Sequence, residues 1–446
     1  MFESIATILR IPDLRNRILF TLAMLAVFRL GIFIPAPGVD RIALGDFFAT
    51  QQNTMFGLYN MFSGGALQQF SVFVLGIMPY ISASIIMQML QHMMPQFERL
   101  SKEGQQGRNK LNQYTRYLTI LIAIIQSFAF ATAMEQMRTQ GGQDIVIAAG
   151  WGFRLLTVCT VTAGSCFVMW LGEQITDRGV GNGSSLIITS GIVAGLPRNA
   201  MNTIEKFRIG EINLLTGALL LAFMFAVVMA IVFVERGQRR IPIQYAKRVV
   251  GRRVYGGQAT HLPIKVNVTG VVPPIFASAV LMFPATITSY YQHPLFEALN
   301  MAFRPGSWTY NMFYVAMIIF FAFFYTALTF NPVDVADNLR RQGGYVPGIR
   351  PGKQTADYLD RILNRLTTGG SIYLAAVCVI PTVLVSEFGV PFYFGGTGLL
   401  IVVGVSLDTV AQIEGHLLTR HYDGLMDKKT KRVRGRRQRL AVTAQE

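Results

Sequence analysis

The sequence predicts an all-α membrane protein with ten transmembrane helices, and three observations support this fold class. Of the 446 residues, 52% are apolar and only 14% are charged, whereas soluble domains carry about 25% charged residues. Apolar runs of about 20 residues, the length that spans a bilayer, recur along the chain. Lys and Arg gather in alternate segments between these runs, as in cytoplasmic loops. The predicted spans are 18–36, 72–93, 117–136, 153–172, 184–198, 213–234, 268–290, 310–330, 368–386 and 395–415.

The basic residues also predict the orientation of these spans. With the N-terminus inside, and with Arg198 at the end of the fifth span counted as outside, 32 of the 40 Lys and Arg lie in cytoplasmic segments and 6 lie outside. Such an asymmetry requires an even number of spans with both termini in the cytoplasm. The most basic segments are 235–267, 331–367 and the tail 416–446.

The composition and motifs exclude several classes of function. The three cysteines all lie in apolar runs, which argues against a disulfide framework. No catalytic motif, metal-ligand spacing or nucleotide-binding loop is present. Gly352-Lys353 resembles the end of a phosphate loop, but Pro347 replaces the first glycine and Gln354 the required hydroxyl residue. We therefore expect no enzyme activity, cofactor or metal.

Ionisable residues inside predicted spans are candidates for function. Arg29 and Asp408 lie deepest, whereas Glu135, Arg154 and Glu414 lie near helix ends. We expect each to be paired within the protein or exposed to a water-filled cavity.

Three segments depart from simple span-and-loop organisation. Residues 54–71, on the outer side, are semi-apolar around Gly64-Gly65 and predict either a surface loop or a re-entrant segment in a protein cavity. Residues 235–267 resemble a basic hairpin. Such a segment either fixes the orientation of the neighbouring spans or docks to RNA or to an acidic protein. Residues 331–367 predict a rigid tip rich in glycine and proline, a common binding device.

Several motifs occur together and in order. They are MFSGGAL with LGIMPYISASIIMQML, GEQITDRGVGNGSS, VERGQRRIPIQYAKRVVGRRVYGGQATHLPIKVN, PPIFASAV, FNPVDVADNLRRQGGYVPGIRPG and VPFYFGGTGLLIVV. With these motifs the chain resembles the SecY/SEC61-alpha family, the channel subunits of the Sec protein translocase, along essentially its whole length.

The resemblance implies two pseudo-symmetric, inverted five-helix halves, 1–200 and 201–446, around a central hourglass pore. This pore would conduct unfolded polypeptide and open sideways, mainly between the second and seventh helices. Its ring would comprise Ile77, Ile81, Ile188, Ile275 and Ile401. Branched apolar side chains would form a gasket around a passing chain, and a narrow apolar constriction excludes ions by dewetting.

The resemblance also implies a short plug helix at about 58–70, made of Met61, Phe62, Ser63, Gly64, Gly65, Ala66 and Leu67. Its glycines would let it swing away. Two positions depart from the family. Ser184 replaces a bulky apolar residue next to the ring and predicts a leakier resting pore, and Gln68-Gln69 replace small or basic residues.

The basic loops would dock partners. Arg252 and Arg253 resemble the family's ribosome-contacting pair, and Arg350 its arginine for coupling to the SecA ATPase; Arg340 and Lys353 belong to the same docking set. The tail predicts contact with anionic phospholipids or the ribosome. The partners implied are SecE and SecG in a heterotrimer, SecA, the ribosome and nascent chain, signal peptides, and YidC with SecDF.

Two other classes explain parts of the pattern. A secondary transporter would also have ten spans in inverted halves, but it predicts polar groups at mid-membrane. An intramembrane protease predicts a nucleophile beside a base.

The expected location is the bacterial plasma (inner) membrane, as a multi-pass protein.

Overall fold

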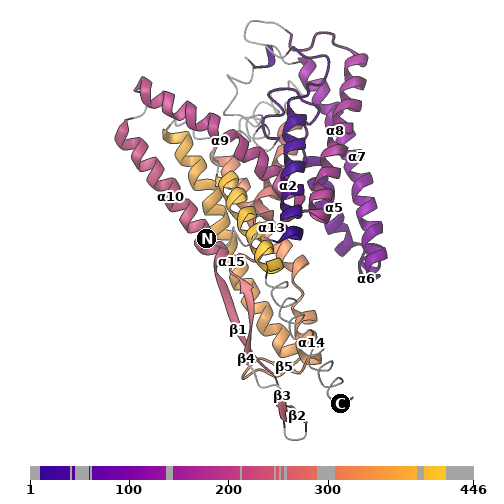
Figure 1. Cartoon of the computed structure of the whole chain (residues 1–446), viewed down its shortest axis with the longest axis vertical. Helices are drawn as coiled ribbons and strands as arrows, with labels where there is room; N and C mark the ends of the chain where they lie inside the picture. Colours follow the sequence, from indigo (N-terminus) through magenta and orange to yellow (C-terminus); the bar gives the residue numbers. More distant parts are fainter. Residues whose placement is uncertain are drawn as a thin grey trace, which may run out of the picture.

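The computed structural model describes residues 11–40, 43–45, 60, 63–136, 144–210, 213–245, 248–250, 253–255, 259–288, 307–388 and 396–417. Long helices form the body of the molecule, and a small group of strands projects from one end (Figure 1).

The N-terminal part of the chain supplies one group of packed helices. They are α2 (Pro12–Ile32), α5 (Met78–Met93), α6 (Pro95–Lys102), α7 (Gln105–Gln136), α8 (Trp151–Arg178) and α9 (Gly183–Ile209). A proline separates α5 from α6, because the residue before a proline is disfavoured in helical conformation. That residue, Met94, is extended at φ −111° and ψ 119°. Helix α7 packs between α5 and α8, and α8 also contacts α2 and α9.

The C-terminal part supplies the second group. It comprises α10 (Leu214–Arg236), α11 (Val272–Thr288), α13 (Trp308–Thr329), α14 (Pro332–Arg341), α15 (Lys353–Phe388) and the helix Gly396–Leu417. The chain turns sharply between α13 and α14 at Asn331-Pro332. The Asn331 side chain accepts a 3.1 Å hydrogen bond from the N–H of Val333, and proline occupies the first helical position. This combination favours a helix start.

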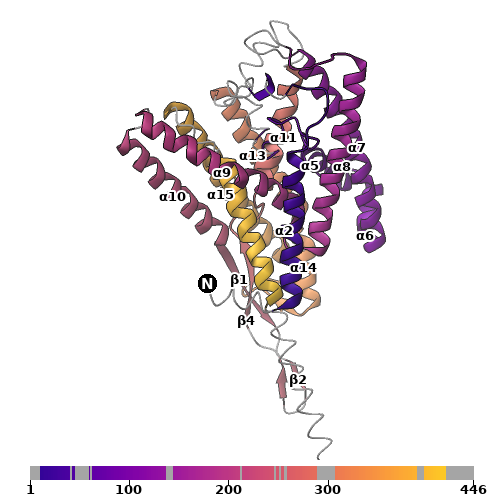
Figure 2. The same ribbon diagram turned by 45° about the horizontal axis from the view of Figure 1, so that its top comes forward.

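Strands from two distant loops form one sheet. β1 (Gln238–Tyr245) pairs antiparallel with β4 (Ala259–Lys265), and its far end pairs with β5 (Gly344–Tyr345). Two shorter strands, β2 (Arg248–Val250) and β3 (Arg253–Tyr255), form the outer end of the hairpin. Figures 1 and 2 show this sheet at the lower end of the molecule, where β1 continues downward from α10. Helix α14 contacts β5.

The buried side chains form three clusters. The largest joins both helical groups and includes Phe28 of α2, Ile187 of α9 and Ile318 of α13. A second lies among the N-terminal helices and the connecting residues near Val39 and Val146, around Phe70 and Phe153. The third holds the sheet against the beginning of α15. Its members are Ile241, Ile264, Val346, Leu359, Ile362 and Leu363.

Each predicted span overlaps a helix, but several boundaries were wrong. Helix α15 begins at Lys353, well before the expected 368, because its first turns are amphipathic and read as a polar loop. Helix α5 begins at Met78 rather than at 72, since residues 72–77 form turns in which Gly76 has φ +54°. Helix α9 continues through Pro197 to Ile209.

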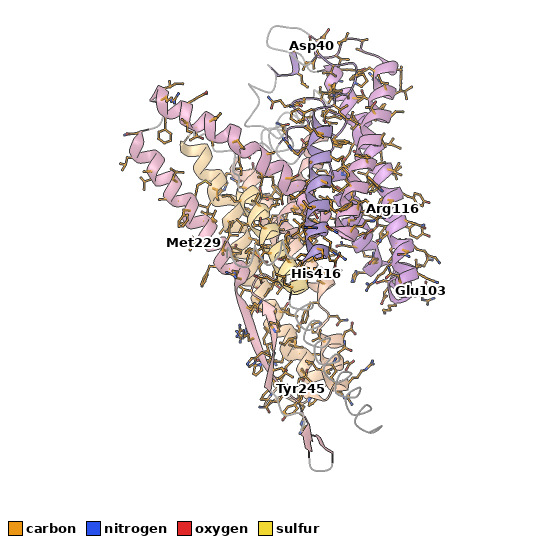
Figure 3. All side chains as sticks on the ribbon, in the orientation of Figure 1. Asp40, Glu103, Arg116, Met229, Tyr245 and His416 are labelled. Atoms are coloured by element: carbon orange, nitrogen blue, oxygen red, sulfur yellow. The ribbon has the colours of Figure 1, made fainter. Side chains whose placement is uncertain are left out.

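Among the described residues, six helices are long and apolar enough to cross a membrane. Their surfaces fit such a setting. The apolar window of α10 is only 12% buried, and Phe225 and Phe233 are 69% and 82% exposed. Figure 3 shows Met229 on the outer flank of this helix. A helix that is apolar all round and poorly covered by protein is suited to contact with lipid.

Candidate pore constriction and plug

The five isoleucines of the expected ring belong to a single buried cluster. Ile77 precedes α5 and Ile81 lies in its first turn; Ile188 lies on α9, Ile275 on α11 and Ile401 on Gly396–Leu417. Between 0% and 7% of each residue is exposed. In this conformation the isoleucines therefore line no water-filled passage.

Small residues let the helices around this cluster approach closely. A Cβ on Gly172 of α8 would lie 3.2 Å from Cδ1 of Ile77 and 3.6 Å from Cδ1 of Ile187. Helix α11 contacts α5 directly, so Ile275 and Ile81 come from neighbouring helices of different groups. An apolar cluster at the meeting point of several helices can block water and ions without binding any sequence.

Ser184 does not belong to this cluster. It lies in the first turn of α9, where its hydroxyl donates a 2.8 Å hydrogen bond to Oδ1 of Asn182, and its N–H donates to the same atom at 3.1 Å. Position 184 is one helical turn before Ile188, so the two residues share a helix face. The Ser184 hydroxyl thus makes a hydrogen bond at the start of α9, next to the ring residue Ile188.

The expected plug is only partly within the described residues. Met61 and Phe62 lie outside them, and Ser63–Phe70 form successive turns rather than the expected helix. Positive φ angles at Gly64 (+69°) and Gly65 (+91°) are incompatible with a regular helix at these two positions. The N–H of Gly65 donates to the carbonyl oxygen of Asn60 at 2.8 Å, and the N–H of Gln68 donates to the Asn60 side chain at 3.0 Å.

The described plug residues connect two buried clusters. Ser63 is 2% exposed, and Ala66 and Leu67 are both 0% exposed. Ala66 packs in the cluster that contains the isoleucine ring. Leu67 packs in the second cluster, with Phe70. The segment thus lies between the ring cluster and the second cluster.

The two plug glycines are required for different reasons. A Cβ on Gly64 would lie 2.8 Å from the Cα of Gly191 on α9 and 3.4 Å from Cδ1 of Ile32 on α2. Gly65 has open space around it, so only its backbone angle favours glycine. Gly191 was not among the expected site residues. A small residue within an apolar helix was its only signal in the sequence.

Arg29 has a partner in the plug. It lies in the last turn of α2, closer to the helix end than expected, because α2 ends at Ile32. Its Nη1 donates a 2.9 Å hydrogen bond to the carbonyl oxygen of Gly64. The expectation of a structural pairing is therefore confirmed for this residue.

Three further ionisable residues are also paired. Arg154 makes hydrogen bonds of 2.8 and 2.6 Å with Oε2 of Glu135, and the N–H of Gly150 donates to the other oxygen. Asp408 lies 3.0 Å from Nζ of Lys265, at the end of β4. The side chains of Lys265 and Asp408 are each more than half exposed.

The structure brings the described members of the expected docking set to one end of the molecule. Arg340, Arg350 and Lys353 are exposed around the tip between α14 and α15. The Thr355 hydroxyl donates to the carbonyl oxygen of Arg350 at 2.9 Å, and Nη1 of Arg340 would lie 4.0 Å from a Cβ on Gly352.

The first basic loop lies beside this tip, since β1 pairs with β5. Figure 3 shows Tyr245, the last residue of β1, at this end of the molecule. The backbone of Arg253 lies in β3, whereas Arg252 lies outside the described residues.

Six described helices that are long and apolar enough to cross a membrane, packed around a buried apolar cluster, identify a polytopic membrane protein. The sequence model of the family described as SecY matches residues 71–410. The chain belongs to the SecY family.

Relatives and solved structures agree with this assignment. The chain is 48% identical to "Protein translocase subunit SecY" of Escherichia coli K12 over 428 residues, covering 95% of this chain and 96% of the relative. It is 45% identical to the protein of that name from Aquifex aeolicus over 423 residues, covering 95% and 99%.

Among solved structures, one described as "The structure of a protein conducting channel" aligns with a TM-score of 0.64 at 17% identity, covering 90% of this chain and 91% of the other. The canine structure "Sec61 in the Canine ribosome-channel complex from the endoplasmic reticulum" aligns with a TM-score of 0.58 at 16% identity, with the same coverage. These likenesses concern the fold.

Proposed function

We propose that this chain is the protein-conducting subunit of a Sec translocase, which passes unfolded secretory polypeptides across the membrane and releases hydrophobic segments sideways into lipid. One observation carries the proposal most strongly. Isoleucines from both ends of the chain meet in one buried apolar cluster, and the plug residue Ala66 packs in the same cluster. A gasket of this kind suits a cargo of variable sequence, because it makes no polar or charged contacts.

The proposed architecture has ten spans in two inverted halves, 1–200 and 201–446, with both termini in the cytoplasm of a bacterium. Contacts between loops support this sidedness. The segments 235–267 and 331–367, both assigned to the cytoplasm, share a sheet. The outer segments 37–71 and 137–152 meet where Val39 bridges Val146.

Gating follows from the placement of the ring and the plug. With the plug seated, the ring isoleucines are buried and apolar, which opposes the entry of water and ions. Displacement of 58–70 together with separation of α5 from α11 would open both the passage and a lateral exit. The contact between α5 and α11 is consistent with a closed lateral gate.

The chain would act as a passive conduit, and its partners would drive transport. SecE and SecG would complete the heterotrimer, and SecA or the ribosome with its nascent chain would dock on the two basic loops. Signal peptides would enter at the lateral gate, YidC and SecDF would assist, and anionic phospholipids would attract the tail 416–446. The tip between α14 and α15, which carries exposed Arg340, Arg350 and Lys353, suits such docking.

Site-specific crosslinking tests the proposal. Cys159, Cys166 and Cys378 are replaced, a single cysteine is placed at Ile275, and a secretory chain is stalled during SecA-driven transport. We expect a crosslink between position 275 and the stalled chain that requires SecA and ATP. A cysteine at Phe225, on the lipid-facing side of α10, serves as the control and should not crosslink.

Two other outcomes would count against parts of the proposal. If position 275 never contacts the stalled chain while cytoplasmic loop positions do, the ring is wrongly assigned. If reconstituted protein with its partner subunits moves no secretory chain at all, the proposed function itself fails.

A further inference from the structure

Arg29 connects a rigid helix to the plug through one polar contact. Its guanidinium Nη1 lies 2.9 Å from the carbonyl oxygen of Gly64, 35 residues further along the chain. We propose that Arg29 is a positioning residue that latches the plug in its closed place, and that breaking this hydrogen bond is a required step in opening. This inference rests on the proposed channel function.

The outer end of α2 is well fixed, so it can serve as an anchor. Phe28 and Ile32 are each 1% exposed and belong to the ring cluster. The ring of Phe28 stacks on that of Phe73 with a centroid distance of 6.0 Å and an interplanar angle of 5°. A Cβ at Gly31 would overlap the Phe73 ring, so the helix and the chain after the plug are in close contact.

Ser63–Phe70 are turns, so their backbone hydrogen bonds form no helical ladder. The N–H groups of Gly65 and Ser71 donate to the carbonyl oxygens of Asn60 and Ala66. The side of the plug at Gly64 rests on α9, where Gly191 leaves room for it. That contact is steric, so it opposes a closer approach of the plug to α9. The hydrogen bond from Arg29 is directional and resists withdrawal of the Gly64 carbonyl.

The chemistry of the acceptor suits a contact that must be released. A guanidinium bound to a carboxylate forms a bidentate ion pair, whereas Arg29 donates to a neutral backbone oxygen. Hydrogen bonds with one charged partner are stronger than neutral ones, but this one lacks the second parallel bond of a bidentate pair. The position of Arg29 at the C-terminal end of α2 also keeps the cation favourable when the plug leaves, since it faces the negative end of the helix dipole.

The test measures exposure of the plug in the assembled complex with its partner subunits. A single cysteine replaces Ser63, which is 2% exposed, and a membrane-impermeant maleimide is added from the outer side. We expect Arg29→Met to raise the labelling rate by at least about tenfold, the factor that corresponds to loss of ~1.4 kcal/mol. The resting ion conductance in planar bilayers should rise with it, and Arg29→Gln should lie between Met and the native residue.

Arg116→Met is the matched control. Nη2 of Arg116 lies 2.8 Å from Oε2 of Glu173, so this variant also removes an arginine contact. Figure 3 shows Arg116 on α7, well removed from Asp40 at the outer end. Its labelling rate should equal that of the native chain.

Each outcome decides the inference. If Arg29→Met transports a secretory protein while its Ser63→Cys plug labels at the native rate, the latch does not exist, although the channel function stands. If Arg29→Met does not assemble, Arg29→Gln replaces it, and a native labelling rate in that variant overturns the latch equally. Absence of transport by the native complex would instead refute the channel function.

Discussion

The backbone N–H of Gly181 donates a 3.0 Å hydrogen bond to Oε1 of Gln412, although 231 residues separate the two. Gly181 lies between α8 and α9, and Gln412 lies on the helix Gly396–Leu417. The neighbouring N–H of Val180 donates to Oγ1 of Thr21 on α2 at 3.0 Å. A single turn therefore binds helices from both ends of the chain, at the side opposite the plug in the proposed topology.

Gln412→Leu should weaken this connection. The Gly181 amide would lose its acceptor, with a cost of about 1 kcal/mol. The midpoint of thermal unfolding of the purified complex in detergent should fall accordingly. Gln88→Leu provides the control, because the amide of Gln88 bonds within its own helix, to Ser84 at 3.4 Å. Equal destabilisation by the two variants would show that the long-range bond adds nothing specific.

Gly64→Ala and Gly65→Ala should differ, although the residues are adjacent. Both have positive φ, which costs an L residue about 1–2 kcal/mol. Only Gly64 would also place its new methyl group 2.8 Å from the Cα of Gly191. We expect Gly64→Ala to raise the resting ion conductance clearly more than Gly65→Ala does.

The reciprocal variant separates the steric cause from the backbone cause. Gly191→Ala adds a methyl group to α9 without changing the plug backbone, and it should raise conductance in the same direction as Gly64→Ala. If Gly65→Ala raises the resting ion conductance as much as Gly64→Ala does, backbone strain alone explains the displacement of the plug.

Leu359→Ala should loosen the packing of β1 and β4 against α15, next to the proposed docking residues, without opening the proposed pore. Leu359 is 0% exposed and belongs to the cluster that holds the sheet on α15. Removal of a buried leucine side chain typically costs 2–5 kcal/mol. We expect faster limited proteolysis of 235–267 and weaker stimulation of SecA ATPase activity, with unchanged resting conductance. The control Asp357→Ala changes an exposed residue of the same helix; a similar loss there would argue against the packing explanation.

The sequence predicts the helices well because hydrophobic runs are local signals. The first turns of α15 escaped detection because their apolar residues, such as Leu359 and Leu363, alternate with charged ones and resemble a solvated loop. The pairing of β1 with β5 also escaped detection, since residues about 100 positions apart in sequence carry no local mark of their contact. Hydropathy identifies which segments are helical or exposed, and only tertiary packing shows which loops share a sheet.

The candidate site also has features that the sequence could predict and features that it could not. The isoleucines could be named only through the family motifs, because their periodicity does not distinguish them from other core residues such as Ile187. The plug was expected to be a helix, but positive φ at Gly64 and Gly65 requires turns. The partner of Arg29 could not be predicted, since its acceptor is a backbone oxygen that any residue would supply.

Ser184→Ile should tighten the resting seal. Position 184 precedes Ile188 by one helical turn, so an isoleucine there would extend the apolar surface beside the ring. The variant loses the hydrogen bond from the Ser184 hydroxyl to Asn182, but the Asn182 side chain still accepts from the N–H of residue 184, as it does in this structure at 3.1 Å. The start of α9 should therefore persist.

We expect Ser184→Ile to conduct fewer ions at rest in planar bilayers, because a longer apolar constriction dewets more readily. Ser185→Ile is the control, since the next residue points about 100° away around the helix. Conductance that stays at the native level in Ser184→Ile would show that the seal already ends at Ile188, and that the serine is tolerated because it serves the helix N-terminus rather than the pore.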